Sequence, residues 1–488
     1  MLRTLNKKKG LFIAISLAMY FLSVIGCYAS ELPDIGDSAG NLLSVEQEKR
    51  LGKEFMINIR QNLKLVDDPV SNEYIQSLGH KLASQIDTRG QSFEFFIVDD
   101  PNINAFAGPA GYIGIHTGLI KATDSESELA SVMAHEIAHV VQRHLVRQFE
   151  SGNTLSMTTM AAIIAAILLG KGNPDISQAV VTSSVAGSIQ QQLSFSRAYE
   201  QEADRVGMEM LAHAGYNPHS MADFFETLQN ANRYNQAGVP EFILTHPVTA
   251  SRIADTRNRA MQMTTNLQPL KTPLSYKLFQ ARINFVTTPE NPPQSKPTLS
   301  ETAHTNDYSG RYEQILFLLR SHKRDDARRE IQHLIKDDKY RIPYIITQAE
   351  IEIDSNNIES AAEKLAQGLI LYPQNQTLSS MYAEVLIKAH KPRNAMLVLQ
   401  GFIRNKQVEN PRMYKIYANA ADQANYKSEA YEAMAEYYYQ LGQTHTAIQH
   451  IEQALAQKDT DAYQKLRLET QLQTMKQEMI KNQAADKN

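Results

Sequence analysis

The chain has 488 residues, of which 43% are hydrophobic and 21% are charged, and its formal net charge is −4. This length exceeds what one core supports and indicates two folded domains. The composition excludes a wholly disordered chain and a polytopic membrane protein. Acidic and basic residues are nearly balanced, and no basic stripe is present, which excludes a nucleic-acid-binding protein.

The first 29 residues have the pattern of a secretory signal peptide. Arg3 and residues 7–9 are basic, residues 11–26 are apolar, and the small residues Cys27 and Ala29 suit a cleavage site. The apolar run of about 16 residues is short for a helix that crosses a bilayer. We therefore expect residues 1–29 to be removed when the chain is secreted.

Cys27 is the only cysteine of the chain, and it leaves two alternatives. Residues 24–27 resemble a bacterial lipobox, in which Cys27 would be lipidated and become the mature N-terminus. Cleavage after Ala29 would instead leave no cysteine, and we favour this soluble form. In either case no disulfide stabilises the fold.

A first domain is expected over residues 31–265, and it mixes helical and strand patterns. Two short β-rich runs predict strands at residues 93–99 and 111–117, and a turn-rich segment joins them. Helical periodicity is clearest in residues 45–63 and 125–149. The predicted fold is α+β, mostly helical with a small sheet.

Residues 266–309 are predicted to connect this domain to a second one, because they become polar and rich in proline. In residues 310–488, Ala327, Ala361 and Ala395 recur every 34 residues. A 34-residue period of paired helices is typical of tetratricopeptide repeats, which form an all-α solenoid. Ala447 breaks the period, so an extra helix is expected near residues 413–424, and a polar capping helix near residues 463–481.

The sequence HEIAH at residues 135–139 lies within a predicted helix that starts at Ser125. His135 and His139 are one helical turn apart, so both imidazoles project from one face and can bind one Zn²⁺. Glu136 adjoins them and is placed to accept a proton from a metal-bound water. His144 follows His139 by five positions and is expected to face away.

A catalytic zinc needs a third protein ligand, and residues 196–215 provide the best candidate. They predict a second helix that ends at Gly215. Glu200 and Asp204 share a face of this helix. Glu200 can ligate the metal, and Asp204 can accept the free N–H of a ligand histidine. Glu202 is expected to point into solvent.

HEIAH and the later Glu200-x-x-x-Asp204 resemble the HtpX-like zinc metallopeptidases. The signal peptide and the helical repeats narrow the resemblance to the BepA type of periplasmic proteases and chaperones. The resemblance implies that Glu200 is the third ligand of one Zn²⁺ per chain, with a zincin-like fold. It also implies that residues 111–119 form an edge strand to which an unfolded substrate adds by main-chain hydrogen bonds.

Residues 246–252 match a further family segment, His246-Pro247 with Arg252. The resemblance implies that His246 is a fourth zinc ligand that displaces water and keeps the enzyme latent. Alternatively His246 stabilises the oxyanion of the transition state once its loop moves. Arg252 either contributes to the same regulatory or transition-state role or anchors the loop.

The resemblance also implies a function. Misfolded or unassembled outer-membrane proteins would be the substrates, and the repeats would bind the barrel-assembly machinery. The protein would act in the periplasm, or facing it from the outer membrane if Cys27 is lipidated. The alternative is a latent or inactive peptidase that serves mainly as a chaperone or assembly scaffold.

An apolar segment at residues 155–169 separates the two predicted metal-binding helices. It is too short to cross a membrane. It is either a mobile flap or membrane-facing hairpin near the active site, giving peripheral membrane contact, or an ordinary buried helix.

Overall fold

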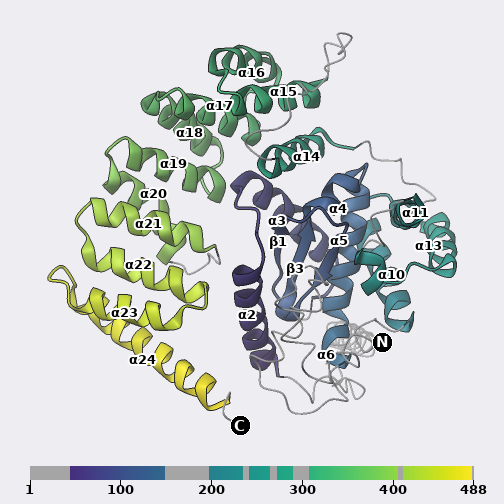
Figure 1. Ribbon diagram of the computed structural model, residues 1–488, viewed down its shortest axis with the longest axis horizontal. Coiled ribbons are helices and arrows are strands. Elements are labelled where there is room, and N and C mark those ends of the chain that lie inside the picture. The colour runs from purple at the N-terminus through teal and green to yellow at the C-terminus, as the bar shows by residue number, and fades with distance from the viewer. Residues whose placement is uncertain are drawn as a thin grey trace, which may run out of the picture. The chain divides into compact units, whose positions relative to one another are not determined.

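The computed structural model describes residues 44–88, 90–148, 197–234, 241–263, 272–288, 307–404 and 410–485 (Figure 1). The expected signal peptide with Cys27, the apolar segment 155–169 and most of the proline-rich connection lie outside the described residues. Among the helices in these ranges, none combines the length and apolar character needed to cross a bilayer.

The first two helices, α2 (Val45–Asn62) and α3 (Pro69–Ala83), precede a three-stranded sheet. Asp68 caps α3 by accepting a 2.9 Å hydrogen bond from the Ser71 N–H, which satisfies one of the free donors at the helix start. The prediction of a helix over residues 45–63 is confirmed.

The sheet consists of β1 (Glu94–Val98), β2 (Ala105–Ala107) and β3 (Tyr112–His116) in the order β1-β3-β2. β3 pairs with β1 in parallel and with β2 in antiparallel orientation. The two predicted strands are confirmed as β1 and β3, but β2 was not predicted. The expectation that residues 111–119 form an edge strand is wrong, because β3 is paired on both sides, and β2 is the edge next to it.

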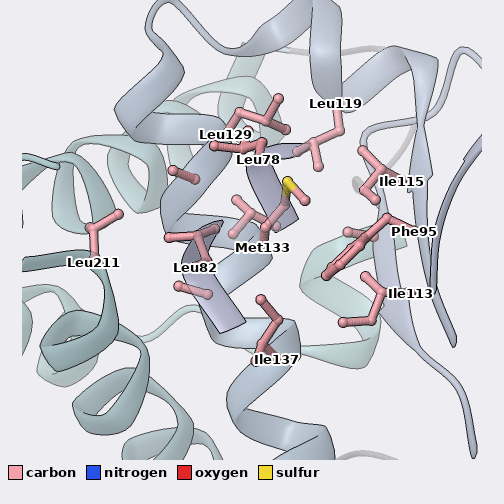
Figure 2. Close-up of a cluster of buried hydrophobic side chains, with 14 of the residues drawn as sticks. Leu78, Leu82, Phe95, Ile113, Ile115, Leu119, Leu129, Met133, Ile137 and Leu211 are labelled. Atoms are coloured by element: carbon pink, nitrogen blue, oxygen red, sulfur yellow. The ribbon is translucent and has the colours of Figure 1, made fainter. Parts of the chain in front are cut away.

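The helix α5 (Glu126–Val141) packs its apolar face between the sheet and the helix α3. Figure 2 shows Met133 and Ile137 of this helix directed towards Phe95, Ile113 and Ile115 of the sheet. These side chains are almost fully buried, and burial of each is worth about 1.5–3 kcal/mol. The hydrophobic core therefore fixes the rotation of α5 about its axis, and with it the direction of the histidines on its other side.

The helix α5 begins as predicted but ends earlier. Ser125 accepts a hydrogen bond from the Glu128 N–H, and the Glu128 carboxylate accepts one from the Asp124 N–H. The expectation of one helix over residues 125–149 is wrong, because Arg143 adopts a left-handed backbone conformation with φ of 52°. After this break the chain resumes as a separate short helix, α6 (His144–Gln148).

The helix α10 (Arg197–His213) lies beside α5 (Figure 1). Gly207 permits this approach, since a Cβ at that position would lie 3.1 Å from the backbone nitrogen of His135. The chain leaves α10 through Gly215, whose φ of +82° favours glycine. The predicted second helix is thus confirmed over the described residues, which begin at Arg197, and it ends before Gly215 as expected.

The described residues of this part contain five further α-helices: α4 (Thr117–Ala122), α11 (His219–Tyr234), α12 (Glu241–Thr245), α13 (Ala250–Met263) and α14 (Leu274–Thr287). The helix α14 was not predicted, since it falls in the expected connection 266–309. Its buried Arg282 donates hydrogen bonds to Asp68 of the N-terminal part at 2.8 Å and to Glu350 of the following all-helical part at 2.7 Å. The helix α14 is therefore a structural joint rather than a flexible tether.

The C-terminal part is all-helical. The helices follow one another along the chain as neighbours (Figure 1). They are α15 (Tyr308–Arg320), α16 (Arg324–Asp338), α17 (Ile342–Asp354), α18 (Ile358–Leu371), α19 (Gln376–Lys388), α20 (Pro392–Arg404), α21 (Pro411–Gln423), α22 (Lys427–Gln440), α23 (Thr444–Leu455) and α24 (Ala462–Ala485). Ala327, Ala361 and Ala395 occupy equivalent places in α16, α18 and α20 and are fully buried. The expected extra helix near residues 413–424 is confirmed as α21.

Candidate metal centre and active site

Three helical segments bring four potential metal ligands to one point. The helix α5 contributes His135 and His139, α10 contributes Glu200, and His246 directly follows α12. Each of the four residues is at most 2% exposed. One ligand atom from each lies within 4.8 Å of all the others. These are the residue types that bind Zn²⁺ in proteins.

The spacing of the four ligand atoms fits a tetrahedral metal. His135 Nε2 lies 3.1 Å from His139 Nε2 and 3.4 Å from His246 Nδ1. Glu200 oxygens lie 3.5 Å from the Nε2 atoms of both His135 and His139, and 2.9 Å from His246 Nδ1. Ligands on a tetrahedral zinc with bonds of about 2.0–2.1 Å are separated by about 3.3–3.4 Å. The donor set therefore fits one zinc ion.

Burial strengthens this reading of the cluster. A buried polar atom that lacks a partner costs about 1–3 kcal/mol, and a buried carboxylate without a countercharge costs more. The cluster gathers the lone pairs of three imidazoles and a carboxylate in a place that solvent does not reach. A divalent cation at their centre compensates all four groups at once.

The charged surroundings affect the two histidines of α5 differently. Burial lowers the pKa of His139 well below its ordinary value, which keeps this ring neutral and ready to bind a metal. Burial would also lower the pKa of His135, but hydrogen bonds to Asp204 and Glu200 outweigh it and raise that pKa to about 9. Metal binding at His135 must therefore displace a proton.

Asp204 and Arg252 support the ligands from outside. His135 Nδ1 lies 3.0 Å from the Asp204 carboxylate, which can accept its proton and orient the ring. Arg252 donates two hydrogen bonds of 2.7 Å to Asp204, and its remaining nitrogen lies 2.7 Å from Glu200. Arg252 also donates to the carbonyl of Pro247. The guanidinium thus ties the His246 loop to the two carboxylates of α10.

Glu136 lies beside the ligand cluster, and its side chain is fully buried. Burial raises the pKa of its carboxyl, against the opposing charges of His246 and His135. His246 Nε2 lies 3.6 Å from the Glu136 carboxylate. A carboxylate with a raised pKa next to a metal-bound water is suited to accept a proton.

Comparison with known proteins relates this arrangement to a family. A model of peptidase family M48 matches residues 69–260. The chain is 31% identical over 478 residues to the beta-barrel assembly-enhancing protease of Escherichia coli (strain K12), covering 96% of this chain and 97% of that protein. The chain belongs to peptidase family M48. Like other M48 peptidases it is a zinc metalloendopeptidase.

Two further relatives agree with this assignment. The putative beta-barrel assembly-enhancing protease of Vibrio cholerae is 45% identical over 255 residues, which covers 52% of each chain. The mitochondrial metalloendopeptidase OMA1 of Arabidopsis thaliana is 29% identical over 226 residues, covering 45% of this chain and 43% of that protein. The names of both relatives, a protease and a metalloendopeptidase, are consistent with the peptidase assignment.

Two sequence expectations about this M48 site are wrong. His144 does not face away: it is fully buried, and its Nδ1 lies 3.0 Å from His139 Nδ1. Glu202 is not simply solvated, because its carboxylate lies 3.2 Å from His144 Nε2. The break at Arg143 explains both, since a continuous helix would have carried His144 to another side of α5. No sequence signal marked this break, because the left-handed residue is not a glycine.

Proposed function

We propose that this M48 peptidase is a latent zinc endopeptidase of the bacterial periplasm that degrades misfolded or stalled outer-membrane β-barrel precursors and also assists their assembly. The observation that carries the catalytic part is the buried cluster of His135, His139, Glu200 and His246 at tetrahedral spacing. The names of the relatives, which are beta-barrel assembly-enhancing proteases, support the substrate class.

His135, His139 and Glu200 would hold one zinc ion per chain. When bound, zinc activates a water molecule and polarises the carbonyl of the scissile peptide bond. Glu136 would accept a proton from the attacking water and deliver it to the leaving amine. Asp204 and Arg252 would keep His135 and Glu200 in their binding orientations. Proton transfer by a positioned carboxylate contributes typically about 10²–10⁴-fold to the rate.

Latency would come from His246. Its Nδ1 lies 3.4 Å from His135 Nε2 and 2.9 Å from a Glu200 oxygen, close to the spacing of two ligands on one zinc ion. His246 would therefore occupy the coordination position that a catalytic zinc leaves to water. Phe242 holds the loop, because its ring stacks on His246 at 4.8 Å and its carbonyl accepts a 2.8 Å hydrogen bond from the His246 N–H. Displacement of this loop would open the site.

A substrate segment would pair with the outer edge of β2, which is buried in this structure and would have to be uncovered first. This strand packs beside α5 and ends the sheet, so its outer main-chain groups are not used within the sheet. An extended, unfolded chain can add to such an edge by main-chain hydrogen bonds, with little demand on side-chain sequence. Misfolded β-rich proteins meet this requirement.

The C-terminal helices would form tetratricopeptide repeats that bind the barrel-assembly machinery and substrate chains. A cavity of about 2140 Å³ lies between α2, α3 and β1 on one side and the helices α19, α21, α22 and α23 on the other. Its walls carry aromatic residues, Phe93 and Phe96 of the sheet part and Tyr414 and Tyr437 of the repeats. A space of this size and mixed character suits an unfolded polypeptide segment and a chaperone role.

Secretion to the periplasm is supported by the leader-like residues 1–29, whose cleavage would leave a soluble protein. Lipidation at Cys27 would instead anchor the protein at the outer membrane, facing the periplasm. The apolar residues 155–169 would provide peripheral membrane contact in either form. The mass of the mature N-terminus distinguishes the two.

A second candidate function is a chaperone or scaffold whose peptidase is silent. The fourth ligand at the metal centre favours it, because a site closed by His246 does no hydrolysis. The repeats would then carry the physiological role. Deleting residues 310–488 would abolish such a role, whereas a change of Glu136 would leave it intact.

The proposed function is tested with the purified chain and an unfolded outer-membrane β-barrel protein as substrate. The wild type should contain one zinc ion and cleave the unfolded but not the folded substrate. Glu136→Gln should retain zinc and lose cleavage, since the amide cannot accept the proton. Glu209→Gln, at an exposed position of α10, serves as the matched control and should cleave normally.

Two results would contradict the proposal. A folded wild-type protein with neither zinc nor affinity for zinc would end the catalytic assignment. Cleavage by Glu136→Gln at the wild-type rate would remove the assigned base.

A further inference from the structure

His144 lies directly behind the zinc ligand His139. The two rings meet edge to face, with centroids 4.8 Å apart and planes at 78°, and their Nδ1 atoms are 3.0 Å apart. His144 is fully buried, although it belongs to neither the ligand set nor the proton-transfer step. A buried polar ring at this place requires partners for both nitrogens.

The second partner of His144 is Glu202, from the helix α10. The Glu202 carboxylate lies 3.2 Å from His144 Nε2. Tyr199 stacks on the His144 ring with centroids 4.5 Å apart. The Arg147 guanidinium lies over the Tyr199 ring and 3.6 Å from the Glu202 carboxylate. These contacts fix both the position and the plane of the His144 ring.

The hydrogen-bond chain allows one arrangement of protons. His139 directs Nε2 at the other metal ligands, so its Nδ1 must carry the proton and donate it outward. His144 Nδ1 is then the acceptor, which places the His144 proton on Nε2. From there it is donated to the Glu202 carboxylate. Both donors in this chain point away from the metal centre, and the chain ends on the Glu202 carboxylate.

We propose that His144 and Glu202 are positioning residues that set the tautomer and orientation of the zinc ligand His139. This proposal rests on the zinc site of the proposed function. The arrangement parallels the support of the other ligand histidine, where His135 Nδ1 faces Asp204. Each histidine of HEIAH thus ends on a carboxylate of α10, directly for His135 and through His144 for His139. Loss of such an outer partner typically weakens metal binding by about 10–100-fold.

The test measures zinc affinity of the full-length chain by competition with a chelator, together with the visible spectrum of the cobalt-substituted protein. His144→Ala should bind zinc about 10–100-fold more weakly and shift the cobalt bands, because His139 loses its acceptor. Glu202→Ala should weaken binding in the same direction. Glu202→Gln should restore most of the affinity, because its side-chain oxygen still accepts the His144 proton.

The control is Glu209→Ala, which removes an exposed carboxylate from the same helix and should change neither affinity nor spectrum. Wild-type affinity and an unchanged cobalt spectrum in His144→Ala would overturn the proposal. If His144→Ala fails to fold, the two Glu202 variants test the proposal, because the Glu202 side chain is 32% exposed and its replacement should be tolerated. Equal zinc affinities of Glu202→Ala and Glu202→Gln would overturn the proposal. A wild type that binds no zinc would instead reject the proposed function.

Discussion

Arg252 donates two parallel hydrogen bonds of 2.7 Å to Asp204, both residues being at most 4% exposed. Because Arg252 also donates a hydrogen bond to the carbonyl of Pro247, this pair connects the loop after α12 to α10. Burial alone would raise the pKa of Asp204, but the hydrogen bonds from Arg252 hold it below its usual range. The carboxylate therefore remains charged behind the ligand His135.

Arg252→Gln should destabilise the protein strongly. Removing the guanidinium leaves Asp204 and Glu200 as buried charges without their cation, a change that typically costs about 3–5 kcal/mol. Urea unfolding of the metal-free protein measures the loss. Arg259→Gln, which breaks an exposed pair with Asp255 on the same helix, should cost less than about 1 kcal/mol. An equal decrease in the free energy of unfolding for the two variants would show that the buried pair contributes no more stability than the exposed pair.

His246→Ala should increase proteolysis while zinc is retained. Three ligands remain, and water can take the vacated position, so activity should rise by about 10-fold or more if the closed form makes up over nine-tenths of the population. Cleavage of casein and zinc content are measured side by side. His213→Ala, at the exposed end of α10, is the control. A fall of about 10²–10³-fold would instead identify His246 as a stabiliser of the oxyanion.

The stability of the protein should depend on His116. Burial lowers the pKa of this ring from 6.5 to about 4, with Asp100 opposing the shift. Between these values the unfolded chain binds a proton that the folded chain does not, so the free energy of unfolding falls as the pH falls. The contribution lost is up to about 3 kcal/mol.

His116→Phe tests this pH dependence, because it keeps the packing against Phe106 without a titrating group. Unfolding by urea is compared between about pH 7 and pH 4.5 on metal-free protein, so that zinc release does not contribute. The variant should lose less stability than the wild type over this range. Parallel pH profiles would exclude His116 as the source.

Arg282→Ala should uncouple the peptidase part from the helical part. Arg282 is buried and bridges Asp68, which caps α3, to Glu350 in α17. Its loss leaves two carboxylates facing one another without a cation, at a typical cost of about 3–5 kcal/mol. Chemical unfolding should then show two transitions in place of one. Arg324→Ala, which removes an exposed ion pair with Asp354, should leave the curve nearly unchanged.

The sequence predicted the features that depend on local pattern. His135 and His139 lie on one helical face, and the start of α5 follows from Ser125 and Glu128, because periodicity and capping act within a few residues. The strand β2 escaped prediction because it has three residues in a turn-rich segment. The central place of β3 was also missed, since strand order depends on pairing between distant segments.

The outer support of His139 was missed for a related reason. It depends on one backbone angle at Arg143, and nothing in the residue type announces a left-handed conformation there. The helix α14 was hidden by the prolines that follow it. Its role as a joint appears only when Asp68 and Glu350 are brought to Arg282 by the folded chain.

The shortness of β2 has a consequence for selectivity. An edge of three residues, Ala105–Ala107, offers few main-chain hydrogen bonds, so a free peptide would dissociate quickly. A chain retained elsewhere on the same molecule would meet this edge at an effective concentration in the millimolar range. Cleavage would then depend more on how long a substrate chain stays bound than on a recognised sequence motif. A chain that dissociates quickly would escape cleavage, and a chain that stays bound would be cleaved.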